Sequence, residues 1–272
     1  MREVGVARIA ANGLEFEVAV CGDGPKLALL LHGFPECGFS WRHQMPLLAD
    51  LGYTVWAPDL RGFGETTRPE RVRDYRMRQL VDDVAGLIDA AGAEQTLLVG
   101  HDWGGAVAWV FALAGIRPLE RFIAMNLPHP RRFREGLRTV KQLRRSWYIF
   151  FFQLPWLPEA FLGANGARRV SGMIRGTAVR KDRFPGEVLE VYRRNADRPG
   201  AISAMLSYYR AFIRHPMDRD LARAVYRTLE TPTLMIWGEG DTALGRELTH
   251  GTDELVEDLT LRYIPGVGHW VQ

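Results

Sequence analysis

Three ionisable residues, Asp102, Asp241 and His269, each come shortly after an apolar run of the kind that forms a buried strand. A carboxylate can attack an electrophilic carbon and form an ester. An imidazole oriented by a second carboxylate can then deprotonate the water that hydrolyses this ester. The pattern therefore predicts Asp102 as the nucleophile, His269 as the base and Asp241 as the acid that orients the base.

The residues around Asp102 predict a sharp turn from a strand into a helix. The apolar run 96–99 leads into Gly100-His101-Asp102-Trp103-Gly104-Gly105, and an apolar segment with helical spacing follows. Such a turn strains the backbone at its centre, so small neighbours are needed. The turn would lift Asp102 above the strand end, where the dipole of the following helix favours a carboxylate. Taken alone, the run also fits a Gly-rich turn in which Asp102 is only a helix cap.

The composition bounds the class of protein. The chain has 272 residues, 47% hydrophobic and 25% charged, which fits one α/β domain with an insertion. The net charge is +3 and no Lys/Arg block is interleaved with aromatic residues, so no nucleic-acid partner is expected. Cys21 and Cys37 form no disulfide framework, which favours a cytoplasmic location. No apolar run reaches transmembrane length, so no membrane partner is expected. We expect no cofactor and no metal.

Apolar runs alternate with helical patterns along the first half of the chain. Residues 7–21 alternate apolar and polar around Asn12-Gly13, which predicts a hairpin. Strands and helices then alternate, which predicts a mainly parallel sheet covered on both faces. The expected strands are 27–31, 54–57, 96–99 and 121–125, and the expected helices are 40–50 and 77–91.

The pattern changes after Pro128. No convincing strand lies between residues 129 and 220, and helices are expected at 133–145, 185–196 and 200–214. We interpret residues 129–220 as a helical cap over the carboxyl edge of the sheet, where open α/β sheets bind ligands. Its arginines are interpreted as the solvated outer faces of the cap helices. The core would comprise residues 1–128 and 221–272, with further strands at 232–237 and 259–264.

Four motifs together resemble the epoxide hydrolase branch of the α/β-hydrolase family, and the resemblance covers nearly the whole chain. They are His32-Gly33-Phe34-Pro35-Glu36, Gly100-His101-Asp102-Trp103-Gly104-Gly105, Gly238-Glu239-Gly240-Asp241 and Gly268-His269-Trp270. The resemblance implies the α/β-hydrolase fold, a mostly parallel eight-stranded sheet with an inserted helical cap. The family continues through a final helix, whereas this sequence ends at Gln272. We therefore expect that helix to be missing and an apolar sheet face to be exposed.

The resemblance also implies roles for residues outside the triad. The backbone N–H groups of Phe34 and Trp103 would form the oxyanion hole, and Pro35 would be a cis proline. Related enzymes protonate the epoxide oxygen with two cap tyrosines, and the matching positions here are Tyr148 and Tyr209. Tyr208 competes with Tyr209 for the second position. Glu36, next to the oxyanion loop, is interpreted as structural.

An apolar pocket is expected around the nucleophile, because small ligands prefer such pockets. The residues expected to bind substrate are Phe34, Trp103, Phe151, Leu154 and Trp270. The expected partners are a small apolar epoxide and water. Any oligomer is expected to be a homodimer formed through the cap.

Two other functions, haloalkane dehalogenation and ligand reception without catalysis, fit parts of the pattern. A haloalkane dehalogenase shares the Asp–His–acid machinery, and the Trp103 indole could bind a halide, but such enzymes often carry Asn or Glu where this chain has Phe34. Several dehalogenases place their acid at the position of Asn126, which leaves Asp241 as the acid here. Fluoroacetate dehalogenases place Arg where this chain has Trp103. A non-catalytic ligand receptor of the same fold is the alternative from a different class; the intact catalytic set argues against it.

Overall fold

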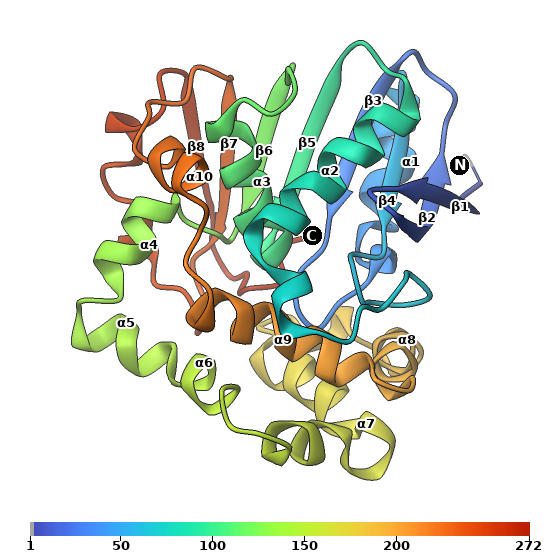
Figure 1. Ribbon diagram of the computed structural model, residues 1–272, viewed down its shortest axis with the longest axis vertical. Helices are drawn as coiled ribbons and strands as arrows, with labels where there is room; N and C mark the ends of the chain where they lie inside the picture. Colours follow the sequence, from blue (N-terminus) through green and yellow to red (C-terminus); the bar gives the residue numbers. More distant parts are fainter. Residues whose placement is uncertain (1–2) are drawn as a thin grey trace.

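The computed structural model describes residues 3–272 and contains one eight-stranded sheet (Figure 1). The strand order is β1-β2-β4-β3-β5-β6-β7-β8. The hairpin of β1 (Gly5–Ala11) and β2 (Leu14–Cys21) is antiparallel, β2 also runs antiparallel to β4 (Tyr53–Pro58), and all other pairs are parallel. The remaining strands are β3 (Lys26–Leu31), β5 (Thr96–His101), β6 (Arg121–Met125), β7 (Thr233–Gly238) and β8 (Leu259–Ile264). The predicted hairpin and mainly parallel sheet are confirmed.

The central strands are continuous apolar runs, which favour a buried position in the middle of the sheet. Every residue of β5 is buried, as is all of β3 except Lys26, because helices cover both faces of the sheet. At the hairpin, Asn12 and Gly13 both have positive φ, the backbone that a tight two-residue turn requires.

Helices of the core cover the two faces of the sheet. On one face, α2 (Met77–Ala91) packs against β1 and β3, and α3 (Asp102–Ala114) packs against β3, β5 and β6. On the other, α1 (Gln44–Asp50) packs against β4. Short 3-10 turns complete the core, at Gly38–Trp41, Val72–Tyr75, Arg246–Thr249 and Thr252–Glu254. The predicted helix at 40–50 therefore starts as a 3-10 turn.

A layer of helices lies across one edge of the sheet, below it in Figure 1. It consists of α5 (Val140–Arg145), α6 (Trp147–Phe151), α7 (Leu157–Thr177), a 3-10 turn (Lys181–Arg183), α8 (Gly186–Asp197) and α9 (Ala201–Arg214). Two further helices, α4 (Pro130–Gly136) and α10 (Arg219–Ala224), lie beside the sheet and pack against α3. We refer to residues 129–220 as the cap. None of the described helices is both long and apolar enough to cross a membrane.

The cap differs from the sequence prediction in three places. The helix expected at 133–145 is two helices, because Thr139 interrupts it and caps α5 by accepting a hydrogen bond from the Gln142 N–H. Helices α6, α7 and α10 were not predicted, and the backbone of α7 leaves the helical region at residues 164–167. The predicted boundary after residue 220 falls inside α10. Residues 265–272, which follow β8, contain no helix.

Candidate active site

Asp102 is the first residue of α3 and sits at the sharp turn that follows β5. Its φ is 47°, a strained value for a residue with a side chain. The turn is tight because α3 starts against the end of β3: the N–H of Gly104 donates to the carbonyl of His32, and a Cβ on Gly104 would lie 2.2 Å from the carbonyl oxygen of Leu31. Only glycine fits there, which explains the small residues of the motif.

One oxygen of Asp102 is already held by the backbone. The N–H of Phe34 donates to Asp102 Oδ1 at 2.8 Å. Phe34 belongs to the loop after β3, and its peptide bond to Pro35 is cis, as expected. The other predicted donor of the oxyanion hole, the N–H of Trp103, lies in the first turn of α3, whose first N–H groups have no partner within the helix.

His269 lies between two carboxylates. Its Nδ1 is 2.7 Å from Asp241 Oδ2, and its Nε2 is 3.5 Å from Asp102 Oδ2. Asp102, Asp241 and His269 follow β5, β7 and β8 respectively, strands that run parallel and therefore end at the same edge of the sheet. All three predicted triad residues are thus brought together.

Asp241 is fixed by more than the imidazole. Its Oδ1 accepts hydrogen bonds from the N–H groups of Ala243 and Leu244, and its Oδ2 accepts one from Asn126 Nδ2 at 2.7 Å. Asn126 is fully buried with positive φ, and its own oxygen accepts from the N–H of Gly238 at 2.8 Å. Sequence reasoning did not foresee this support, although an Asn at a strand end is a residue type that tolerates positive φ.

A second buried pair fixes the backbone of His269. His101 Nδ1 is 2.9 Å from Glu36 Oε2, and His101 Nε2 is 2.9 Å from the carbonyl oxygen of His269. Ser40 donates a further hydrogen bond to Glu36. Glu36 and His101 therefore lie beneath the triad as positioning residues.

The charges of the three groups support one another. Burial alone would lower the pKa of His269, but the negative charges and hydrogen bonds of Asp241 and Asp102 outweigh it and raise that pKa well above its ordinary value. Burial alone would raise the pKa of each carboxyl, but His269 outweighs it and holds both below their ordinary values. Each of the three groups thus favours the charged form of its neighbour.

Two tyrosines share a cavity with Asp102. Tyr148 comes from α6 and Tyr209 from α9, and their ring centroids are 5.9 Å apart. Burial and the charge of Asp102 raise the pKa of both phenols, so both are neutral hydrogen-bond donors. Tyr208 points elsewhere, because adjacent helical residues face different directions, and its hydroxyl donates to the carbonyl of Arg61 at 2.8 Å.

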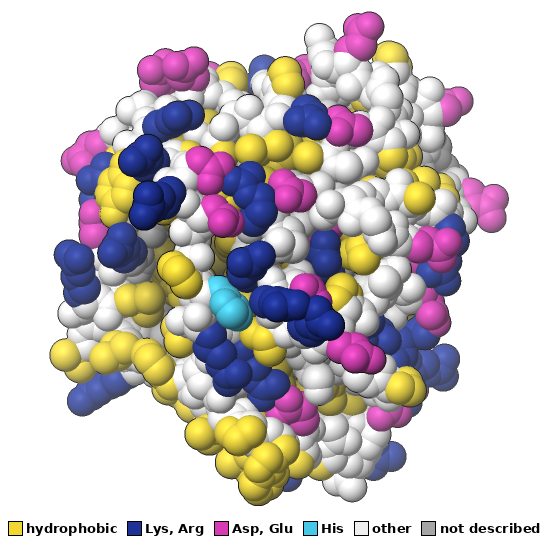
Figure 2. Space-filling view, viewed as in Figure 1, with side chains coloured by type: hydrophobic (Ala, Val, Ile, Leu, Met, Phe, Trp, Pro, Cys, Tyr) yellow, Lys and Arg dark blue, Asp and Glu magenta, His cyan; other side chains and the backbone are white. Residues whose placement is uncertain are grey.

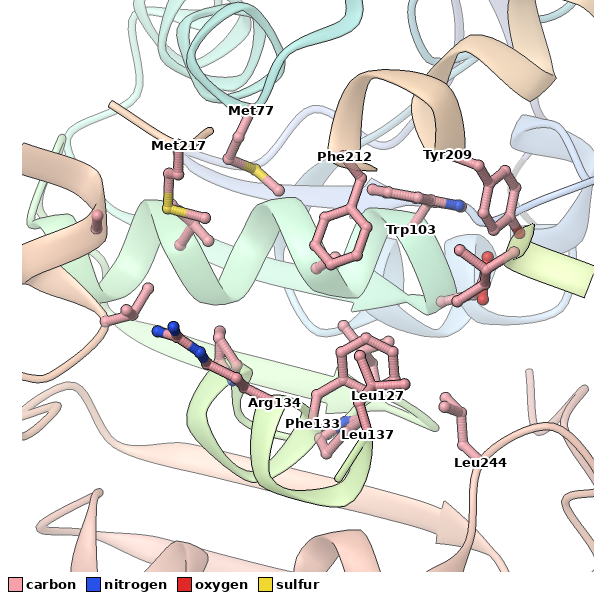
Figure 3. A pocket seen from close by; sticks show the side chains of 18 of the residues that line it. Met77, Trp103, Leu127, Phe133, Arg134, Leu137, Tyr209, Phe212, Met217 and Leu244 are labelled. Atoms are coloured by element: carbon pink, nitrogen blue, oxygen red, sulfur yellow. The ribbon is translucent and has the colours of Figure 1, made fainter. Parts of the chain in front are cut away.

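The cavity has a volume of about 490 Å³ and an apolar lining. It runs along α3 from Asp102 and Trp103 to Val110, eight residues or roughly 12 Å. In Figure 3, Tyr209 and Trp103 lie at one end of it and Met77 and Met217 at the other. The other lining residues are Ala106, Leu127, Pro128, Pro130, Phe133, Arg134, Leu137, Ile149, Phe212, Ala222, Val225, Tyr226 and Leu244.

The structure corrects several predicted pocket residues. Phe151 packs on Phe161, and Leu154 is largely exposed, because the inner face of α6 carries Tyr148 and Ile149 instead. Trp270 lies behind the triad, against the His101 and His269 rings, and donates to Thr177.

Phe34 is buried beside the cavity and contributes mainly its N–H, with its ring packed edge-on against Phe152 and Tyr209. Phe212 was missed, although it is three residues from Tyr209 and thus on the same helical face. Of the predicted pocket residues, Trp103 does line the cavity. Residues 3–272 contain no group of three or more His, Cys, Asp or Glu side chains placed to hold a metal ion.

Comparison with known proteins places this geometry in context. Residues 27–272 match the model of the alpha/beta hydrolase fold family. The AB hydrolase superfamily protein YfhM of Bacillus subtilis is 39% identical, over 97% of this chain and 91% of its own length. Human epoxide hydrolase 4 is 35% identical, over 97% of this chain and 73% of its own length. The crystal structure of a Bacillus megaterium epoxide hydrolase superposes with a TM-score of 0.88 at 28% identity, covering 97% of this chain and 93% of that one.

The raised pKa of His269 makes a prediction about stability. Because this pKa lies above the ordinary value of 6.5, its contribution to folding is fully present below about pH 6.5 and is lost as the pH rises through the folded-state pKa. The wild type should therefore lose stability relative to His269→Gln between about pH 6 and pH 10. Urea unfolding of both proteins at the two pH values measures the difference, and a difference that stays constant or grows contradicts the assignment.

Proposed function

This chain belongs to the epoxide hydrolase branch of the α/β-hydrolase family, and from that premise we propose that it hydrolyses apolar epoxides to vicinal diols through an ester on Asp102. The observation that carries the proposal is the placement of His269 between Asp241 and Asp102, at the end of an apolar cavity that two neutral tyrosines also line. The nucleophile and the proton donors thus line a space that an apolar substrate fits, and the base contacts the nucleophile.

The first step would form the ester. Oδ2 of Asp102 attacks an epoxide carbon, while Oδ1 stays bound to the N–H of Phe34. The carbon–oxygen bond of the epoxide breaks, and its electron pair stays on the oxygen. Tyr148 and Tyr209 donate hydrogen bonds to this oxygen, and one phenol transfers its proton to it. Low dielectric in the apolar cavity strengthens these interactions.

Ester formation would also switch on the base. The ester has no charge, so one of the two carboxylates that raise the pKa of His269 is lost. His269 then releases its proton to solvent more readily, while Asp241 still orients the ring. A neutral imidazole thus becomes available only when there is an ester to hydrolyse.

The second step would release the diol. His269 takes a proton from water, and the resulting hydroxide attacks Cγ of Asp102. The negative charge that develops on Oδ1 is stabilised by the N–H of Phe34. The bond from Cγ to Oδ2 breaks, and the departing alkoxide takes the proton from His269. The new carboxylic acid of Asp102 then gives its proton to the phenolate, which restores the phenol, and His269 regains a proton from solvent once Asp102 is charged again.

The two-step scheme predicts that the intermediate can be trapped. In His269→Gln, ester formation should proceed and hydrolysis should stop, because the ester forms without a base. Intact mass spectrometry after addition of styrene oxide should then show an adduct of one substrate mass. Asp102→Asn is the control and should stay unmodified. Unmodified His269→Gln, or adduct on Asp102→Asn, contradicts the scheme.

The tyrosines can be tested separately from the triad. Tyr148→Phe and Tyr209→Phe should each slow ester formation by about 10² or more, and the double variant should nearly abolish it, because the developing alkoxide loses its donors. Stopped-flow Trp fluorescence in single turnovers measures this rate. Tyr208→Phe is the matched control and should keep the wild-type rate, because its hydroxyl binds Arg61. An unchanged rate in the double variant would remove the tyrosines from the mechanism.

Product analysis with an epoxide and with a haloalkane distinguishes the proposed function from its alternatives. Diol formation from styrene oxide without halide release from 1-bromobutane supports the epoxide reaction. Bromide release without diol formation would instead favour a dehalogenase that uses the same Asp102 and His269. Tight binding of apolar epoxides without turnover would favour a receptor.

A further inference from the structure

An apolar stripe runs along the outer surface of the cap. Six side chains at alternating intervals of three and four residues are 41–66% exposed: Val140, Leu143, Trp147, Phe150, Leu154 and Leu157. Trp156 is 72% exposed and Phe161, four residues after Leu157, is 46% exposed. We call residues 140–161 the apolar stripe. Figure 2 shows hydrophobic side chains along the lower left and bottom edges of the molecule, where Figure 1 places α5 and the start of α7.

The stripe is a surface feature and does not belong to the cavity. On α6, Tyr148 and Ile149 line the cavity, whereas Trp147 and Phe150 face outward. Single exposed apolar residues are ordinary on proteins, but eight of them within residues 140–161, two of them tryptophans, are typical of an interaction surface. Such a surface would be an aggregation hazard if nothing covered it.

The charges around the apolar stripe indicate which kind of partner would bind there. Between residues 136 and 181 there are nine Lys and Arg and one acidic residue, Glu159, which is bound to Arg210. Arg138, just before α5, and Lys141 and Arg144 within it are exposed, and of these Lys141 is paired with Glu247 at 3.0 Å. The guanidinium of Arg169 lies 4.2 Å above the ring of Phe161, at the end of the stripe. A partner that matches this surface therefore has both an apolar region and negative charge.

The charge asymmetry extends to the whole cap. Residues 129–220 hold 19 of the 35 Lys and Arg but only 8 of the 32 Asp and Glu, a net charge of +11. The rest of the chain has 16 basic and 24 acidic residues, a net charge of −8. A homodimer formed through the cap would bring two strongly positive surfaces together, which like-charge repulsion opposes. A second copy is thus the weaker explanation.

We propose that the apolar stripe docks the cap onto the surface of a lipid bilayer that contains anionic headgroups. Trp147, Trp156 and the Phe side chains would enter the boundary between headgroups and acyl chains, which suits amphipathic aromatic rings. The surrounding Arg and Lys would bind the headgroups electrostatically. The chain lies on the membrane and does not span it. This proposal departs from the sequence analysis, which expected no membrane partner, because the spacing of apolar residues does not tell an exposed face from a buried one.

Vesicle co-sedimentation tests the proposal without any need for activity. Binding should be weak on phosphatidylcholine vesicles, increase when about 30 mol% phosphatidylglycerol is included, and decrease as salt is raised. The double variant Trp147→Ser/Trp156→Ser should bind the anionic vesicles about tenfold more weakly or less still, because two rings no longer enter the interface. Its far-UV circular dichroism should match the wild type, since both side chains are exposed.

A matched control distinguishes binding through the apolar stripe from nonspecific binding by any exposed apolar side chain. Leu47 and Leu51, at α1 on the core, are 65% and 73% exposed but lie outside the stripe. Leu47→Ser/Leu51→Ser should bind vesicles like the wild type. Equal loss in both double variants, or no preference for anionic vesicles, overturns the proposal. So does light scattering that shows a dimer dissociated by Trp147→Ser/Trp156→Ser without vesicle binding, because the stripe would then be a subunit interface.

Discussion

The arrangement depends on one imidazole held between two buried carboxylates. Any of these charges alone would be costly inside the protein, and each becomes acceptable because the next neutralises it. His269 is 2.7 Å from Asp241 and 3.5 Å from Asp102, so a small displacement of any of the three loops would break these contacts. Asn126 fixes Asp241 from one side, and the Glu36–His101 pair fixes the backbone of His269 from the other. The parallel strands bring the three loops to one edge of the sheet.

This electrostatic arrangement would also order the proposed steps. While Asp102 is ionised it is an available nucleophile, and its charge favours the protonated form of His269. Once Asp102 is esterified, the charge that favoured the imidazolium is gone, and the base is released. One group would thus act as nucleophile and as regulator of the base. The tyrosines stay neutral because burial and the same charge oppose their ionisation.

The sequence was informative wherever a local motif determines the backbone. The elbow at Asp102, the hairpin at Asn12-Gly13 and the triad order all follow from residue types at strand ends, because parallel strands end at a common edge. The cap was less predictable. Which face of α6 or α9 points inward depends on how the helices pack together, and this placed Phe212 in the cavity and Phe151 outside it. The bond from Asn126 to Asp241 spans 115 residues and has no local signal.

The central claim, that Asp102 forms a covalent ester, predicts the origin of the oxygen in the product. In a single turnover with excess enzyme in water enriched in oxygen-18, the diol should contain no heavy oxygen, because its new hydroxyl comes from the Asp102 carboxylate. The heavy oxygen should instead be found in the peptide that contains Asp102, by mass spectrometry after proteolysis. Heavy oxygen in the diol of the first turnover, with unlabelled Asp102, would show that water attacks the substrate directly and would contradict the account.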